Sequence, residues 1–260
     1  MKTALITGAS AGFGKAIATS FARKGYRIII TGRRKNHLEK LKSVLLNLGA
    51  SAVQVLSFDI QNKTDVFDAI ASLSAEWNTL DILVNNAGLA SGRATLVSGE
   101  IDDWERMLNT NVKGLLYMTK AVFPHLRSSQ NAHIVNIGSI AGTEVYPGGN
   151  VYCASKHAVN ALSKAMRIEL LADGIRVSQI RPGLAKTEFS IVRYSGDETK
   201  AAAVYAGYEP LLAEDIARAV DFVVDSPKHV CINDMEITPT AQANAYLIEK
   251  KQTGLREKKF

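Results

Sequence analysis

Apolar runs alternate with amphipathic stretches along almost the whole chain. Several of the runs are β-branched and apolar on both faces, as expected of strands buried in a parallel sheet. The predicted strands cover residues 4–7, 27–31, 52–58, 80–84, 133–137, 175–180 and 235–238. Stretches with helical periodicity lie between them, such as 38–49, which ends in a glycine. The alternation predicts an α/β fold: one doubly wound, Rossmann-like parallel sheet of about seven strands with helices on both faces.

The domain organisation follows from length and composition. A chain of 260 residues, 47% hydrophobic and 22% charged, matches one globular domain with a sizeable core. We expect that domain to cover 1–245, with a lid at about 187–208 and a basic C-terminal tail at 246–260. No apolar run approaches the roughly 18 residues of a membrane helix. Cys153 and Cys231 lack metal-site spacing, so we expect a reduced cytoplasmic protein with no metal.

The formal net charge of +6 has two interpretations. A basic protein can bind nucleic acid, but that function needs the basic residues gathered on one face or stripe. Here they are scattered, and the densest cluster is REKKF at the C-terminal end. A solvated tail, together with an anionic cofactor and an anionic small-molecule substrate, explains the charge better. We therefore expect neither nucleic acid nor a membrane as partner.

The run TGASAGFG, residues 7–14, stands between the first predicted strand and a helix beginning near Lys15. Gly8, Gly12 and Gly14 leave room for a pyrophosphate to approach the backbone, and the helix offers free N–H groups and its positive dipole end. A tight turn without a ligand is the alternative, since a glycine-rich loop alone is a weak signal. The position at the first strand–helix junction favours a dinucleotide.

The second strand ends in TGRR, which places Arg33 and Arg34 where NAD-binding proteins carry an acid for the ribose 2′-hydroxyl. An acid would repel a 2′-phosphate, whereas arginine binds it through charge-assisted hydrogen bonds. The pair therefore favours NADP(H). The alternative for one of them, Arg34 rather than Arg33, is that it only begins the next helix in solvent.

Two further strand ends carry candidate cofactor contacts. Asp59 and Ile60 follow the third strand, where a loop can meet an adenine ring, although Asp59 can also serve as the cap of a helix starting near Asn62. The run NNAG, residues 85–88, follows the fourth strand. Its amides can tie neighbouring strand ends together, and Gly88 allows close contact with a ribose, a role compatible with a structural turn.

Tyr152 and Lys156 lie four residues apart in YCASK, which places both on one face of a helix. A free tyrosine has a pKa of about 10 and is a poor acid–base catalyst at neutral pH. A nearby ammonium group stabilises the phenolate and lowers that pKa. The pair can then exchange a proton with a substrate oxygen near physiological pH.

These motifs, with Asn111, Ser139 and Pro182-Gly183 in the expected order, resemble the short-chain dehydrogenase/reductase family from Thr7 to about Thr238. The resemblance implies that Tyr152 is the acid–base and that Lys156 holds the nicotinamide ribose. It further implies that Ser139 hydrogen-bonds the substrate oxygen and that Asn111 holds a water of a proton relay. The cofactor residues it implies are Gly8, Ser10, Gly12, Phe13, Gly14, Arg33, Arg34, Asp59, Ile60, Asn86, Ala87, Gly88, Tyr152, Lys156, Pro182, Gly183 and Thr187.

A closer resemblance, carried by TGRR, AEWNTLDILVNNAGLA, NIGSIAG, YPGGNVY and TEFSIVRYSGD, is to the NADP-dependent 3-hydroxy acid dehydrogenases. It implies hydride transfer between NADP(H) and the alcohol or carbonyl of a short acid, such as serine, allo-threonine or 3-hydroxypropionate (malonic semialdehyde when oxidised). Sulfoacetaldehyde reductases share much of the pattern. Lys186 departs from it, which leaves the exact substrate open. The family also implies a homotetramer that packs through helices near 102–123 and 152–171.

Arg193 is the candidate for binding the substrate's anionic group, together with Ser139 and Tyr152 at the reacting oxygen. Arginine offers a planar fork to a carboxylate or sulfonate. The alternative is an ion pair with a surface acid, Asp197 or Glu198.

Two other function classes fit less well. A serine hydrolase would need a nucleophile elbow, and no G-x-S-x-G surrounds Ser139. A non-catalytic NADP-sensing protein on the same fold would be expected to have lost catalytic groups, whereas this chain keeps Asn111, Ser139, Tyr152 and Lys156.

Overall fold

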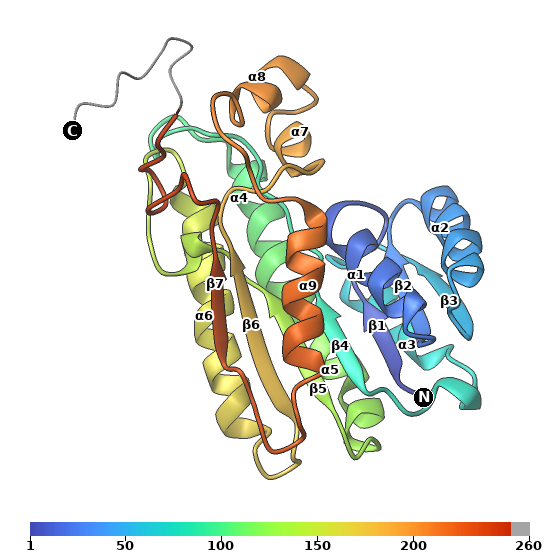
Figure 1. The fold of residues 1–260 in the computed structure, drawn as a ribbon. Coiled ribbons are helices and arrows are strands. Elements are labelled where there is room, and N and C mark those ends of the chain that lie inside the picture. Colours follow the sequence, from blue (N-terminus) through green and yellow to red (C-terminus); the bar gives the residue numbers. More distant parts are fainter. Residues whose placement is uncertain (251–260) are drawn as a thin grey trace, which may run out of the picture.

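A seven-stranded, all-parallel sheet forms the centre of the molecule in the computed structural model, which describes residues 1–250 (Figure 1). The strand order is β3-β2-β1-β4-β5-β6-β7. The strands are β1 (Thr3–Ile6), β2 (Arg27–Gly32), β3 (Ala52–Ser57), β4 (Ile82–Asn85), β5 (His133–Ile137), β6 (Arg176–Pro182) and β7 (Asp234–Ile237). Each predicted strand overlaps one of these, so the predicted fold class is confirmed.

Helices cover both faces of the sheet, because its inner strands are buried on both sides. One apolar core lies under α1 (Gly12–Arg23), α2 (Lys35–Asn47) and α9 (Ala213–Val224). The core on the other face lies under α3 (Lys63–Ala71), α5 (Leu115–Arg127) and α6 (Asn150–Glu169). Helix α4 (Ile101–Leu108) packs beside α6, and a short π-helix, η2 (Asn109–Gly114), joins α4 to α5. Two 3₁₀ turns complete the set, η1 (Ala75–Trp77) and η3 (Ile140–Gly142).

The strand order reverses at β1, which pairs with β2 on one side and β4 on the other. In doubly wound sheets, ligands bind beyond the carboxyl ends of the strands at such a switch point. Two short helices, α7 (Phe189–Arg193) and α8 (Glu198–Ala203), stand above that end of the sheet (Figure 1). They lie in the segment 187–208, for which a lid stays a prediction; we refer to this segment as the lid.

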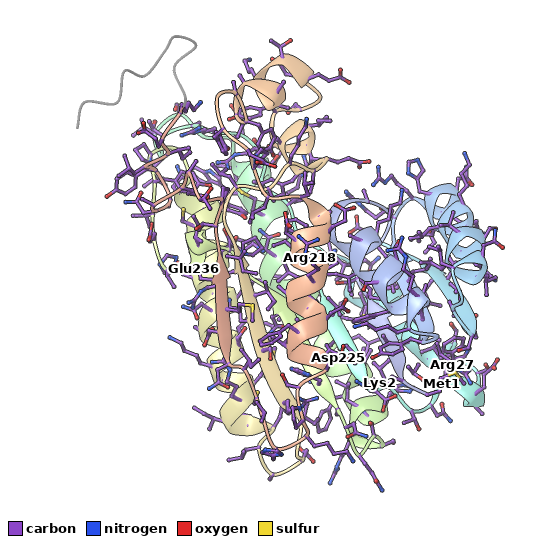
Figure 2. All side chains as sticks on the ribbon, in the orientation of Figure 1. Met1, Lys2, Arg27, Arg218, Asp225 and Glu236 are labelled. Carbon is purple, nitrogen blue, oxygen red and sulfur yellow. The ribbon has the colours of Figure 1, made fainter. Side chains whose placement is uncertain are left out.

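Charged side chains at the opposite end of the sheet hold the α1–α9 layer in place. Lys24 lies 2.8 Å from both Asp221 and Asp225 on the α9 side, and Lys2 lies 3.7 Å from Asp225. Figure 2 labels Lys2 and Asp225 at this end, far from α7 and α8. This cluster therefore has a structural role, and the site must be sought at the other end.

The C-terminal segment returns to the lid end of the sheet. The Gln242 side chain accepts a hydrogen bond from the Leu184 N–H at 2.8 Å and donates one to the Asn244 carbonyl at 3.1 Å. Ile248 forms an isolated bridge with Gln242. The expected tail begins just after this turn, and its first residues, Tyr246 and Leu247, are 67% and 58% exposed; 251–260 lie outside the described residues. Across residues 1–250, no helix is long and apolar enough to cross a membrane.

Candidate active site

Tyr152 and Lys156 lie one turn apart in α6, and both side chains are buried, at 8% and 6% exposure. The Lys156 Nζ donates a hydrogen bond to the Ile137 carbonyl, at the end of β5, over 3.0 Å. Burial lowers the pKa of Lys156 to about 8. The predicted placement of both residues on one helix face is thus what the structure has.

The electrostatics of the Tyr152 phenol differ from the sequence-based expectation. Burial is the largest influence and raises its pKa well above the usual range, while a side-chain hydrogen bond with Ser139 and the charge of Arg193 act in the lowering direction. We expected Lys156 to lower this pKa. In the chain by itself, desolvation exceeds every lowering influence, because the phenol lies in an apolar cluster with Leu89, Met107 and Ala141.

Ser139 stands at the start of η3, directly after β5. Its hydroxyl accepts a hydrogen bond from the Ala141 N–H at 3.1 Å and donates one to the Pro182 carbonyl at 3.4 Å. Gly138, just before Ser139, packs closely against Gln179, a fully buried residue on β6: a Cβ on Gly138 would lie 2.5 Å from the Nε2 of Gln179. The sequence therefore places the Ser139 hydroxyl through close packing as well as through its own bonds.

Asn111 is buried in the π-helix η2 behind Lys156. Its amide donates to the Leu89 carbonyl at 2.8 Å and the Ser155 hydroxyl at 3.0 Å, and its Oδ1 accepts from the Leu89 N–H at 2.8 Å. A Cβ on Gly88 would lie 3.2 Å from this Oδ1 and 3.6 Å from the Lys156 Nζ. π-helical turns often occur at functional sites, and here one brings Asn111 to Gly88, which Lys156 also approaches. The water relay stays a prediction.

A cleft of about 410 Å³ opens at the switch point of the sheet. It gathers residues from the glycine loop, the ends of β2 to β5, α6 and the start of the lid. Of the expected cofactor residues, those that line it are Gly8, Ser10, Gly12, Phe13, Arg33, Arg34, Asp59, Ile60, Asn86, Ala87, Gly88, Tyr152, Lys156 and Thr187. Gly14 lies beneath the loop, where a Cβ would be 2.6 Å from the Gly8 carbonyl. Pro182 and Gly183 line a neighbouring cavity instead.

The glycine loop fits a pyrophosphate. Gly8 and Gly12 adopt φ angles of +65° and +53°, which side-chain-bearing residues rarely do. Helix α1 begins at Gly12 with no side-chain cap and no acidic residue in its first turn. Its first N–H groups and positive dipole end are therefore free for an anion. The Asn86 amide donates to the Thr7 and Gly8 carbonyls at 2.8 and 3.2 Å and ties β4 to this loop, as predicted for NNAG.

Both arginines of TGRR border the cleft, and each faces a carboxylate. Arg33 lies 3.6 Å from Asp59. Arg34 precedes α2, yet its guanidinium reaches Glu188 of the lid at 2.9 Å. Arg34 thus begins α2 with its side chain 43% exposed, as the alternative stated, and it also borders the cleft. The alternative for Asp59 as a helix cap is wrong, because Asn62 caps α3 by accepting from the Thr64 and Asp65 N–H groups.

A second cavity, of about 570 Å³, adjoins the first under the lid. Tyr152 lines both cavities, and Ser139 and Arg193 line the second. Its wall holds four cationic side chains and no carboxylate among the described residues; the cations are Arg93, Arg193, Lys200 and Lys250. Such a wall suits an anionic ligand that reaches Tyr152 from this cavity.

Arg193 is held in place by neutral groups. It donates to the Tyr146 hydroxyl at 2.9 Å and the Gly92 carbonyl at 3.4 Å, and its guanidinium lies 5.7 Å from the centre of the Tyr152 ring. Asp197, one of the acids considered as its partner, instead caps α8 and pairs with Lys200 at 3.1 Å. No salt bridge in residues 1–250 involves Arg193. Its charge is thus available to a ligand.

Several residues that line the second cavity have no role in the sequence-based prediction. Tyr146 lies in the quoted run YPGGNVY and Phe189 in TEFS, yet neither was assigned a role; the Phe189 ring lies 5.7 Å from the Tyr152 ring. Arg93, Tyr246 and Lys250 carry no local signal. Only the return of the C-terminal segment and the packing of the 88–95 loop bring them to the cavity.

Comparisons with known proteins agree with this geometry. The chain matches the model of the short chain dehydrogenase family over residues 2–197, and it belongs to that family. It is 44% identical over 249 residues to the NADP-dependent 3-hydroxy acid dehydrogenase YdfG of Escherichia coli O6:H1, covering 95% of this chain and 99% of that protein. A sulfoacetaldehyde reductase of Chromohalobacter salexigens is 42% identical over 94% of this chain and 96% of its own length.

A solved structure described as the closed form of serine dehydrogenase complexed with NADP+ superposes with a TM-score of 0.89 at 43% identity. The match covers 96% of this chain and all of that one, 100%. Such agreement over the whole fold places the two cavities and the Tyr152–Lys156 pair in an enzyme of the short-chain dehydrogenase class.

Proposed function

We propose that this protein transfers hydride between NADP(H) and the alcohol or carbonyl of a short anionic substrate. The substrate class is a 3-hydroxy acid such as serine, allo-threonine or 3-hydroxypropionate, or malonic semialdehyde in the reductive direction. One observation carries the proposal: Tyr152 borders both the dinucleotide cleft and a cavity whose charged wall residues, among those described, are all cationic.

NADP(H) is supported by Arg33 and Arg34 at the end of β2, where a 2′-phosphate would meet two guanidinium groups. The glycine loop and the uncapped start of α1 suit the pyrophosphate. Lys156, one turn from Tyr152 in α6, borders the cleft and would hold the nicotinamide ribose. The relatives that carry NADP in their names add to this support.

When bound, the nicotinamide supplies or accepts the hydride. The chain manages the proton and the developing charge. Because burial raises the pKa of Tyr152, its phenol is protonated at neutral pH and can donate to a carbonyl oxygen during reduction. Ser139 can donate a second hydrogen bond to the same oxygen, and a protonated Lys156 stabilises the phenolate left behind. In the oxidative direction the phenol first loses its proton, and the phenolate then accepts the proton of the alcohol.

The anionic end of the substrate is assigned to Arg193. Its contacts with Tyr146 and Gly92 fix the guanidinium near the Tyr152 ring, so the charge needs no reorganisation when the substrate arrives. An acid of three carbons has room to reach both Arg193 and the Ser139–Tyr152 pair in a cavity of about 570 Å³.

Reduction of sulfoacetaldehyde is the second candidate. Arg93 and Arg193 both lie against the Tyr146 ring, with guanidinium carbons 5.9 and 5.5 Å from its centre. Two guanidinium groups offer more donors than the two oxygens of a carboxylate need. A sulfonate, with three oxygens, would use them more fully.

The test is a substrate screen. Serine, allo-threonine, 3-hydroxypropionate, 3-hydroxyisobutyrate and isethionate are each offered with NADP+, and the matching carbonyl compounds with NADPH, while the absorbance of reduced nicotinamide is followed. We expect turnover of at least one acid, and loss of nearly all turnover in Tyr152→Phe with NADPH binding retained. Binding without turnover of any compound would favour the NADP-sensing alternative, and turnover by Tyr152→Phe would refute the role of the phenol.

Two further expectations stay proposals. Cys153 and Cys231 are both free thiols, which suits the reducing cytoplasm. A homotetramer would cover apolar side chains on the helices named for it, such as Leu108, Leu116 and Ile168, which are 40%, 40% and 76% exposed. Light scattering of the purified protein gives the assembly directly.

A further inference from the structure

Glu188, a residue of the lid, reaches across the dinucleotide cleft to the end of β2. Its Oε2 accepts a hydrogen bond from Arg34 Nη1 at 2.9 Å, although the two residues are 154 positions apart in the chain. Both residues line the cleft. The contact therefore lies inside the proposed cofactor site, at the end where the 2′-phosphate of NADP(H) would bind.

All three nitrogens of the Arg34 guanidinium already donate hydrogen bonds within the protein. Besides the contact with Glu188, its Nε and Nη2 donate to the Ser10 hydroxyl at 3.2 and 3.0 Å. Glu188 makes no second side-chain hydrogen bond within residues 1–250. A phosphate that binds Arg34 must then share this guanidinium with a carboxylate or displace it.

The neighbouring arginine repeats the arrangement in a weaker form. Arg33 lies 3.6 Å from Asp59, but the Asp59 carboxylate also accepts a hydrogen bond from the Gln61 N–H at 3.0 Å. The charges of these two arginines are thus balanced by two carboxylates before any phosphate arrives. Of the two carboxylates, Glu188 makes the shorter contact, and it comes from the lid, whereas Asp59 follows β3.

We propose that Glu188 is a specificity-determining residue for the cofactor. Its carboxylate competes with the 2′-phosphate for Arg34 and thereby weakens the binding of NADP(H). The inference rests on the proposed use of NADP(H). Its physical basis is that a carboxylate close to a phosphate dianion repels it and also occupies its donor. NADH has no 2′-phosphate, so its binding does not involve this competition. Glu188 thus lowers the affinity for NADP(H), which helps the oxidised and the reduced cofactor to replace one another at the site.

The test is Glu188→Gln in the full-length protein, because glutamine keeps an acceptor for Arg34 and removes only the charge. Dissociation constants for NADPH and NADH are measured by nicotinamide fluorescence at low and high salt. We expect NADPH to bind about threefold to tenfold more tightly, which is the range for partly exposed charges near a doubly charged group. NADH binding should change by less than about twofold, and the gain for NADPH should shrink at high salt.

Glu198→Gln is the matched control. It removes the same charge from the first turn of α8 in the same lid, outside the cleft, and should leave both dissociation constants unchanged. Unchanged or weaker NADPH binding in Glu188→Gln overturns the inference, as does an equal tightening for NADH. If the wild-type protein binds NADH as tightly as NADPH, the proposed use of NADP(H) is refuted, and the inference about Glu188 is refuted with it. A preference for NADPH with no effect of Glu188→Gln defeats the inference alone.

Discussion

Arg193 allows the sharpest test of the proposed substrate class. Arg193→Met removes the guanidinium but keeps an apolar stem that fills much of the same space. In the wild type, the Arg193 guanidinium donates to the Tyr146 hydroxyl and the Gly92 carbonyl. It also lines the second cavity, which has no carboxylate among its described wall residues. Its loss removes the nearest positive charge to Tyr152 on that wall, while Arg93 remains against Tyr146.

The expected magnitude follows from the number of hydrogen bonds lost. A guanidinium fork can make two hydrogen bonds to an anion, and a hydrogen bond to a charged group contributes about 1.5–3 kcal/mol. With Arg93 compensating in part, we expect a loss of about 3 kcal/mol for an anionic aldehyde, which is roughly 100-fold in kcat/KM. A neutral aldehyde of the same length should lose less than about threefold, because it makes no such hydrogen bonds.

The assay compares kcat/KM for malonic semialdehyde or sulfoacetaldehyde with that for propanal, using NADPH. Arg218→Met is the control, since Arg218 is an exposed arginine on α9 paired with Asp215 (Figure 2). It should leave both substrates unaffected. An equal loss for the anionic and the neutral aldehyde in Arg193→Met, or no loss for either, would refute the anion-binding role.

Two further predictions concern Lys156 and the Ser139 loop. Burial lowers the pKa of Lys156 to about 8 from a usual 10.5, so above about pH 8 the unfolded state holds more protons than the folded state. The stability of the wild type relative to Lys156→Met should therefore rise between about pH 8 and pH 10 in urea unfolding; a pH-independent difference would contradict the shift. Gly138→Ala should destabilise the fold by about 1–3 kcal/mol because its Cβ meets Gln179, and Gln179→Ala in the same protein should restore part of the loss. Additive losses in the double variant would argue against that contact as the cause.

Local pattern was sufficient where short-range geometry decides the outcome. The inner strands follow from runs that are buried on both faces. The glycine loop follows from the positive φ angles of Gly8 and Gly12 and from the close approach of the Ala87 backbone to Gly8. The four-residue spacing of Tyr152 and Lys156 fixes their common face on α6 whatever surrounds them. Fold class, cleft position and the common helix face of Tyr152 and Lys156 could therefore be predicted from the amino-acid sequence.

Only the tertiary structure decided the contacts between segments that are distant in the chain. It turned Arg193 toward Tyr146 and away from Asp197, brought Glu188 to Arg34, and placed Lys250 in the wall of the second cavity. It also set the burial that raises the pKa of Tyr152. These features depend on how the lid and the C-terminal segment pack over the sheet, and no periodicity within either segment encodes the partner it meets there.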